Sequence, residues 1–225
     1  MAALEALESK ARDLGLTLND RSFFESLDRQ DEFAHLRERF HIPKPKAGSD
    51  RSESIYLCGN SLGAMPRKAR DYVNAELDKW AKFGVDGHFE EPHPWVSIDE
   101  SVQASSARLV GAEVSEVAIM NSLTINLHLM MAAFYKPDVS SGKVKIMVEG
   151  KAFPSDMHML QSQLRWHNLD PESSLVALEP RAGETNLRTE DILSAIETHK
   201  DELALVLISG VQYYTGQFFE VIKEL

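Results

Sequence analysis

Hydrophobic residues in the second half of the chain form short continuous runs, and each run is followed by a segment with helical spacing. Strands that alternate with helices in this way are typical of βαβ units with right-handed crossovers. Because most of the strand residues form continuous apolar runs, we expect a mostly parallel sheet that is covered on both faces. The fold class is therefore α/β, with strands predicted at residues 117–120, 143–148, 175–178 and 203–208 and helices at 124–135, 156–167 and 190–199.

The first part of the chain is predicted to be helical. Residues 3–14 favour a helix by composition, and Phe33, Leu36 and Phe40 share one helical face. Residues 46–50 follow two prolines and are typical of a linker. We place a domain boundary there, between an N-terminal helical segment, residues 1–50, and an α/β domain, residues 51–225.

Two further helices and one further strand are predicted between the linker and the alternating region. Residues 55–58 form a short apolar run, which indicates a strand that ends at the glycine-containing segment 59–63. Pro66 is a suitable first residue for a helix that ends near Gly84. Residues 99–111 predict another helix, again closed by a glycine.

The composition excludes several classes of protein. The chain has 35 acidic and 24 basic residues, a formal net charge of −11, which disfavours binding to nucleic acid or to an anionic membrane. A single cysteine, Cys58, cannot form an internal disulfide. Glu5 and Glu8 interrupt any signal peptide, and no apolar run reaches the roughly 18 residues of a membrane span. We therefore expect a cytoplasmic globular protein.

Common catalytic signatures are absent from the sequence. It contains no P-loop, no G-x-G-x-x-G and no G-x-S-x-G, so Ser209 is not a nucleophile of the hydrolase type. His88 and His93 lie beside Glu90 and Glu91, but this spacing fixes no third ligand, and we do not expect a metal site.

Strand-to-helix junctions remain as candidate binding sites, because ligands of open α/β sheets lie at the carboxyl ends of the strands. At residues 121–124, free backbone N–H groups and the hydroxyls of Ser122 and Thr124 suit a phosphate, although simple helix capping is the favoured interpretation. At residues 153–156, Phe153 could stack on a flat ring, or the segment could only start a helix. The glycines of residues 59–63 allow a ligand to approach the backbone, or form a simple turn.

Several motifs at these places resemble kynureninase, in the same order along the chain. Tyr56–Gly63 reads YLCGNSLG, and Ser209–Gln217 reads SGVQYYTGQ. The resemblance runs from about residue 31 to residue 219, and the other matching segments are residues 76–82, 120–129, 151–156 and 190–193. Several long motifs in register are highly specific.

The resemblance implies a pyridoxal-phosphate enzyme of the aspartate-aminotransferase fold, fold type I, of which residues 51–225 are part of the large domain. Kynureninases hydrolyse L-kynurenine to anthranilate and L-alanine, or 3-hydroxykynurenine to 3-hydroxyanthranilate and L-alanine, in tryptophan catabolism towards NAD synthesis. They are cytoplasmic homodimers with active sites at the subunit interface, so the resemblance implies a homodimer here.

The resemblance also assigns roles to individual residues. Leu123 and Thr124 hold the cofactor phosphate, and Phe153 stacks on the pyridine ring. Pro154, Ser155, Asp156 and Ser209 complete the cofactor site. Ser61 and His88 face the substrate, and Trp95 is interpreted as a packing residue.

Two stretches expected from the resemblance are missing. The sequence has no Ser-Tyr-Lys-Tyr, which carries the Schiff-base lysine, and no Asp-Leu-Ala-His, which supplies the partner of the ring nitrogen. We therefore assign no catalytic residue and expect the chain to be a truncated product that is inactive alone. The alternative is a non-catalytic form that pairs with full-length subunits, and an unstable product without a role is a third interpretation.

Overall fold

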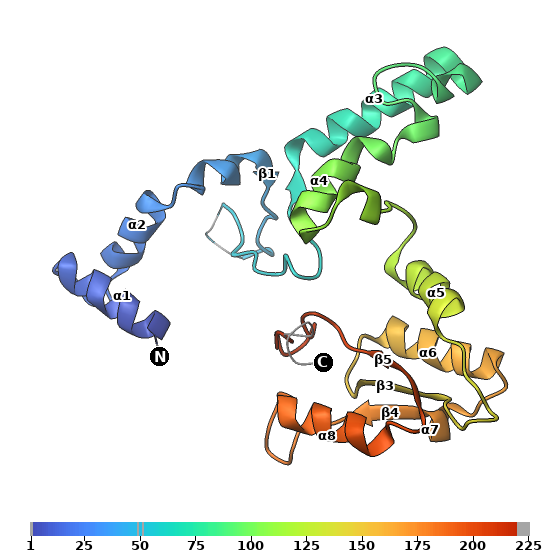
Figure 1. Ribbon diagram of the computed structural model, residues 1–225. Helices are drawn as coiled ribbons and strands as arrows, with labels where there is room; N and C mark the ends of the chain where they lie inside the picture. Colours follow the sequence, from blue (N-terminus) through green and yellow to red (C-terminus); the bar gives the residue numbers. More distant parts are fainter. Residues whose placement is uncertain (1, 49, 51, 220–225) are drawn as a thin grey trace. The chain divides into compact units, whose positions relative to one another are not determined.

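The computed structural model describes residues 2–48, 50 and 52–219. The chain divides into two compact units, Met1–Val96 and Ser97–Leu225, and each unit is described separately below (Figure 1). The domain boundary predicted near residue 50 lies within the first unit and stays a prediction. Among the described residues, no helix is both long and apolar enough to cross a membrane.

The first unit consists mainly of helices. Its long helix α3 begins directly after Pro66 and ends at Gly84, whose φ of 54° is a conformation that favours glycine, as the sequence predicts. The elements in chain order are α1 (Ala2–Asp13), α2 (Arg21–Gln30), η1 (Ala34–Arg39), β1 (Phe40–His41), β2 (Met65–Pro66), α3 (Arg67–Phe83) and η2 (Gly84–His88), and η3 (Trp95–Ser97) crosses the boundary between the units.

The helix predicted through Phe33 and Phe40 is wrong. Residues 34–39 form a short 3-10 helix, and Phe40 belongs to strand β1, which pairs antiparallel with β2 in the register Phe40 to Pro66. The Arg67 side chain donates to the Glu38 carbonyl at 2.8 Å, which ties the end of this segment to the start of α3. The pairing with β2 therefore takes Phe40 out of the helical pattern.

The strand predicted at residues 55–58 is also wrong. Ile55 and Leu57 are 69% and 84% exposed, and within the described residues this segment pairs with no strand. The Cys58 carbonyl instead accepts the N–H groups of Ser61 and Leu62, both at 3.0 Å. Segment 59–63 is therefore a turn.

The second unit contains the alternating strands and helices that the sequence predicts. The strands at β3 and β5 and the helix at α5 agree with the prediction within two residues, and β4 agrees at both ends. The elements are α4 (Glu100–Val110), η4 (Val114–Glu116), α5 (Leu123–Phe134), β3 (Lys145–Glu149), α6 (Pro154–Trp166), α7 (Pro171–Ser174), β4 (Leu175–Leu178), α8 (Thr189–His199) and β5 (Leu203–Leu207).

One strand prediction in this unit fails, because residues 117–120 are irregular. The Gln103 side chain, on α4, donates to the carbonyls of Val114 at 3.1 Å and of Val117 at 2.6 Å. The beginning of this segment is therefore bound to a helix rather than to a strand.

The sheet is parallel, in the order β4-β3-β5, so the α/β fold class is confirmed. Successive side chains of β3 point to opposite faces. Ile146 and Val148 pack in a cluster with α5 and α6, whereas Met147 packs in a cluster with Ile192 of α8. Helices α6 and α8 cover the two faces (Figure 1).

Gly150 lies where the central strand leaves the sheet. Its N–H donates to the Leu178 carbonyl at 2.7 Å, which brings the backbone of this residue close to the end of β4. A Cβ at this position would lie 2.7 Å from the Leu178 oxygen and 2.1 Å from Glu179 Oε1. The position therefore has no room for a side chain without a shift of the backbone.

We predict that Gly150→Ala lowers the free energy of unfolding by about 1–3 kcal/mol, because the new methyl group overpacks this edge. Chemical denaturation followed by circular dichroism measures the change. Gly210→Ala is the matched control, since a Cβ there meets no atom within 4 Å. Equal stability of the two variants would contradict the prediction.

Candidate functional site

The carboxyl edge of the sheet in the second unit borders a half-open cavity. Strands β3 and β5 end at it, and the first turns of helices α5 and α6 border it. Its volume is about 210 Å³, and its walls are mostly apolar. The residues that line it are Leu123, Leu127, Val148, Glu149, Ala152, Asp156, Leu207, Ile208 and Ser209.

Three of the predicted cofactor residues meet at this cavity, each from a different element. Leu123 begins α5, Asp156 lies in the first turn of α6, and Ser209 follows β5. Thr124, Pro154 and Ser155 are the chain neighbours of these residues, and Phe153 immediately precedes α6. The junctions that the sequence singled out in this unit are therefore brought to one place.

The start of α5 is suited to an anion. Ser122 occupies the N-cap position, but its side chain makes no capping hydrogen bond, so the capping interpretation is wrong for this residue. The first N–H groups of a helix have no partner within the helix, and the helix dipole makes this end positive. The Asn126 N–H is the one that closes the first turn, on the Ser122 carbonyl at 3.0 Å.

The start of α6 carries an aromatic ring and an acid. Phe153 is the N-cap residue and Pro154 the first helical residue. The Phe153 ring packs edge-on against Tyr213, with 5.0 Å between the ring centroids. Burial raises the pKa of Asp156, and a hydrogen bond from the Ser155 hydroxyl at 3.3 Å opposes this effect.

Glu149 is the one charged residue of the cavity wall that the sequence reasoning missed. Its side chain is only 4% exposed, and the Ser209 hydroxyl lies 2.9 and 3.0 Å from its two carboxylate oxygens. Burial is the main cause that raises the pKa of Glu149, and the nearby charge of Asp156 adds to it. An acid directly after the apolar run at residues 146–148 was the available signal.

Two glutamines fix the loop that follows β5. The buried Gln212 donates to the Lys151 carbonyl at 2.7 Å and accepts the N–H groups of Tyr214 and Thr215 at 2.6 and 2.8 Å. Gln217 makes hydrogen bonds to both the N–H and the carbonyl of Leu187. The turn that carries Tyr213 is thereby held beside Phe153.

The predicted substrate residues belong to the first unit. Ser61 lies in the turn at residues 59–63, and His88 ends η2. His88 Nδ1 lies 2.8 Å from the Val85 carbonyl, and its ring packs edge-on against Trp95 at a centroid distance of 5.3 Å. Contact of these residues with a substrate stays a prediction.

A buried lysine anchors the segment that follows His88. Lys79, on α3, is 8% exposed and donates to the carbonyls of Glu90, Pro92 and His93. Glu76, one turn earlier, accepts the Trp95 indole N–H at 2.6 Å, and this bond holds the pKa of Glu76 below its ordinary value. Trp95 thus has the packing role that we expected, and a Cβ on Gly87 would lie 2.6 Å from its ring.

The comparisons with known proteins identify relatives with one shared name. The chain is 49% identical to the kynureninase of Monosiga brevicollis, over 94% of the chain and 50% of that protein. It is 42% identical to the kynureninase of Mus musculus, over 97% and 48%, and 46% identical to that of Myxococcus xanthus, over 90% and 46%. The chain thus spans about half the length of these curated relatives, and no model of a protein family matches it.

We predict that Lys79→Met lowers the free energy of unfolding by about 2 kcal/mol and exposes residues 84–97 to exchange, because three carbonyls lose a charged donor. Hydrogen–deuterium exchange of peptides from this segment measures the second effect. Lys68→Met, at an exposed position of the same helix, is the control. Unchanged exchange in the Lys79 variant would refute the anchoring role.

Proposed function

Since the chain resembles the N-terminal half of kynureninases, we propose that its second unit binds pyridoxal phosphate in the cavity at the carboxyl edge of the sheet. The observation that carries this proposal is the convergence of Leu123, Asp156 and Ser209 on one cavity. They come from two helix starts and one strand end, which are distant in sequence.

The residues present fit this group chemically. The first turn of α5 suits the phosphate, because its N–H groups and dipole favour an anion. Leu127, Val148 and Leu207 provide apolar walls for a flat ring. Asp156 and Ser209 supply the few polar groups that fix the orientation of a ligand in a mostly apolar pocket. Phe153, at the start of α6, is proposed to stack on the ring.

The proposed reaction is that of a kynureninase, acting on L-kynurenine or 3-hydroxykynurenine. When bound, pyridoxal phosphate supplies a ring that accepts electrons from the bonds of an amino acid. This chain contributes the binding of the phosphate by Leu123 and Thr124 and the orientation of the ring by Phe153 and Asp156. Ser61 and His88 are proposed to contact the substrate.

The chain alone is proposed to bind pyridoxal phosphate but not to catalyse the reaction of kynurenine. Its sequence has neither the Ser-Tyr-Lys-Tyr nor the Asp-Leu-Ala-His stretch that the resemblance implies. A lysine amine that forms a covalent bond to the carbonyl of the cofactor is part of catalysis in such enzymes. We therefore assign the cofactor residues of this chain to binding.

We predict that Thr124→Val weakens the binding of pyridoxal phosphate about tenfold, because a hydrogen bond to a charged phosphate is lost with little change of shape. Equilibrium dialysis against pyridoxal phosphate measures the affinity. Thr198→Val on α8 is the matched control, since the hydroxyl of Thr198 bonds to the Ser194 carbonyl in the same helix.

The same preparation tests the reaction. With pyridoxal phosphate and L-kynurenine, we expect no anthranilate fluorescence above background, whereas a full-length kynureninase gives product. No saturable binding of pyridoxal phosphate by the wild-type chain would overturn the proposed function. Formation of product would overturn the restriction to binding.

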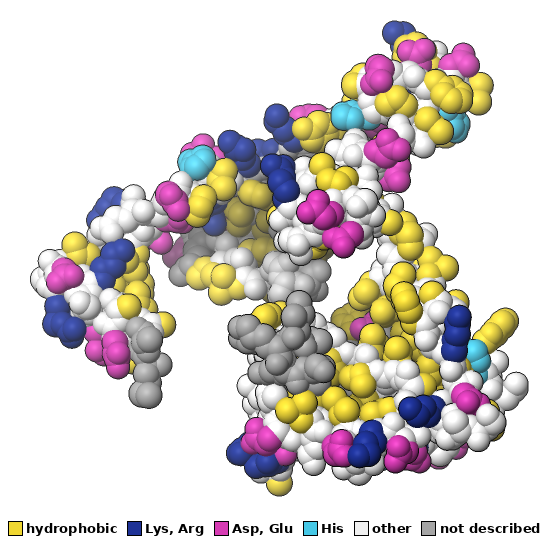
Figure 2. Space-filling view, in the orientation of Figure 1, with side chains coloured by type: hydrophobic (Ala, Val, Ile, Leu, Met, Phe, Trp, Pro, Cys, Tyr) yellow, Lys and Arg dark blue, Asp and Glu magenta, His cyan; other side chains and the backbone are white. Residues whose placement is uncertain are grey.

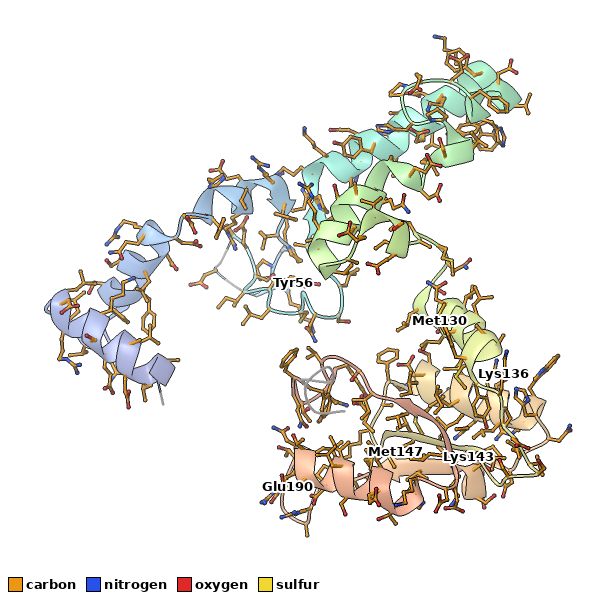
Figure 3. The ribbon with its side chains drawn as sticks, in the orientation of Figure 1. Tyr56, Met130, Lys136, Lys143, Met147 and Glu190 are labelled. Atoms are coloured by element: carbon orange, nitrogen blue, oxygen red, sulfur yellow. The ribbon has the colours of Figure 1, made fainter. Side chains whose placement is uncertain are left out.

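A second candidate role is pairing with full-length subunits, and the surface of α5 favours it. Helix α5 is apolar around most of its circumference, which is typical of a helix that is covered by other protein. Figure 2 shows hydrophobic side chains gathered over this part of the second unit, and Met130, labelled in Figure 3, is one of them. The exposed large apolar residues of the helix are Leu123, Ile125, Leu129, Met130 and Phe134.

We predict that the chain co-purifies with a tagged full-length kynureninase when both are expressed together, because the apolar face of α5 becomes buried. The double substitution Met130→Gln and Phe134→Gln is expected to reduce the recovered amount severalfold. Equivalent substitutions at Leu109 and Val110, exposed on α4, are the control. Failure of the wild-type chain to co-purify would remove this role.

A further inference from the structure

Ser209 and Glu149 form a buried pair in the wall of the cavity. Ser209 follows β5 and Glu149 ends β3, so the pair joins two neighbouring strands at their carboxyl ends. The Ser209 Oγ lies at nearly equal distances, 2.9 and 3.0 Å, from the two carboxylate oxygens. Both residues line the cavity.

The direction of this hydrogen bond follows from the chemistry of the two groups. A carboxylate can only accept, and a serine hydroxyl has one proton to donate. The Ser209 proton is therefore used by Glu149, and only the lone pairs of its oxygen remain available. Towards the cavity, Ser209 can act only as a hydrogen-bond acceptor.

Among the described residues, no lysine, arginine or histidine forms an ion pair with the Glu149 carboxylate, although Glu149 is only 4% exposed. A buried carboxylate without a cation is costly for the folded state. A bound group with a positive charge or a donor proton would offset part of that cost.

We propose that Glu149 is a positioning residue, which fixes the Ser209 hydroxyl as an acceptor and so selects a ligand that presents an N–H or O–H group at this end of the cavity. The carboxylates of Glu149 and Asp156 repel a phosphate here, whereas the start of α5 attracts one. The cavity therefore takes a ligand with an anionic end and a donor end. This inference rests on the proposed function for the identity of the ligand, since pyridoxal phosphate carries both a phosphate and a ring hydroxyl that can donate a proton.

The test compares Glu149→Gln, Ser209→Ala and the double variant, with Glu172→Gln as a control at an exposed position on α7. The amide that Glu149→Gln introduces has nearly the shape of the carboxylate, but it can donate to the Ser209 oxygen and release the serine proton. The change therefore allows the hydrogen bond to run in either direction and keeps the volume of the side chain, so Ser209 is no longer fixed as an acceptor.

The first measurement uses the ligand-free chain and follows thermal unfolding from about pH 4 to about pH 8. The groups around Glu149 are Asp156 on α6, Ser209 after β5 and the apolar Leu178 opposite it on β4. Glu149 also lines a smaller cavity together with Lys151, and the Glu179 carboxylate lies beside the neighbouring Gly150. Because the pKa of Glu149 is raised in the folded state, its contribution to the free energy of unfolding is fully present at low pH and is lost as pH rises through that pKa.

The melting temperature of Glu149→Gln should therefore rise relative to that of the wild type as pH increases. Ser209→Ala should fall relative to the wild type over the same range, because the Ser209 hydrogen bond lowers the pKa of Glu149. Glu172→Gln should follow the wild type throughout. Differences that do not depend on pH would show that the two groups are not coupled and would overturn the proposal.

The second measurement is the affinity for pyridoxal phosphate at neutral pH. We expect at least a tenfold loss in Glu149→Gln and in Ser209→Ala, and a loss in the double variant that is smaller than the product of the two, because the residues act as a pair. The affinity for inorganic phosphate, measured by its displacement of pyridoxal phosphate, should change less than twofold, since the start of α5 is intact. If Glu149 and Ser209 acted only in folding, the affinities for the two ligands would fall together.

The two proposals fail in different ways. If Glu149→Gln binds pyridoxal phosphate within twofold of the wild type, the positioning role is wrong and the proposed function stands. If the wild type does not bind pyridoxal phosphate, the proposed function and the ligand selection both fail, and the pH dependence of the ligand-free variants still decides whether Glu149 and Ser209 are coupled.

Discussion

The burial of strand β3 on both faces is the constraint on which the second unit depends. Its residues pair in parallel with β4 on one side and with β5 on the other. Ile146 and Val148 pack towards α5 and α6, and Met147 packs towards α8. Because this strand is covered on both faces and paired on both sides, the chain leaves it at the carboxyl edge of the sheet. There Glu149 lines the cavity, and Gly150 packs against the end of β4.

Most of the second unit could be predicted from the sequence, because its signals are local. Apolar runs of strand length identify β3, β4 and β5, and Gly111, with φ of 70°, ends α4 as a glycine should. The two wrong strand predictions instead concern the segments with which these residues would have to pair. Residues 55–58 look like a strand, but a strand also needs a neighbour, and no local pattern shows whether one exists. Residues 117–120 fail because the Gln103 side chain binds the carbonyl of Val117.

The residues of the candidate site likewise divide into those that local sequence patterns predict and those that depend on contacts formed in the fold. The starts of α5 and α6, which carry Leu123 and Asp156, follow within two residues from the alternation of strands and helices, and this alternation also places them at one edge of the sheet. Their assignment to a cofactor came from the resemblance and not from spacing. Glu149 was missed because the apolar run that predicts β3 ends at Val148, so the next residue was assigned no role. Gln212 was missed because its importance lies in contacts with Lys151 and Tyr214, which only the folded loop brings together.

The hydrogen bonds of Gln212 have a consequence for the thermodynamics of ligand binding. Its amide group holds the turn at Tyr213 and Tyr214 from inside, with no help from a ligand. The conformational entropy of this loop is therefore lost when the protein folds. A ligand that reaches Phe153 contacts a ring pair, Phe153 and Tyr213, that is already ordered. Its binding free energy is therefore not reduced by the cost of ordering these rings.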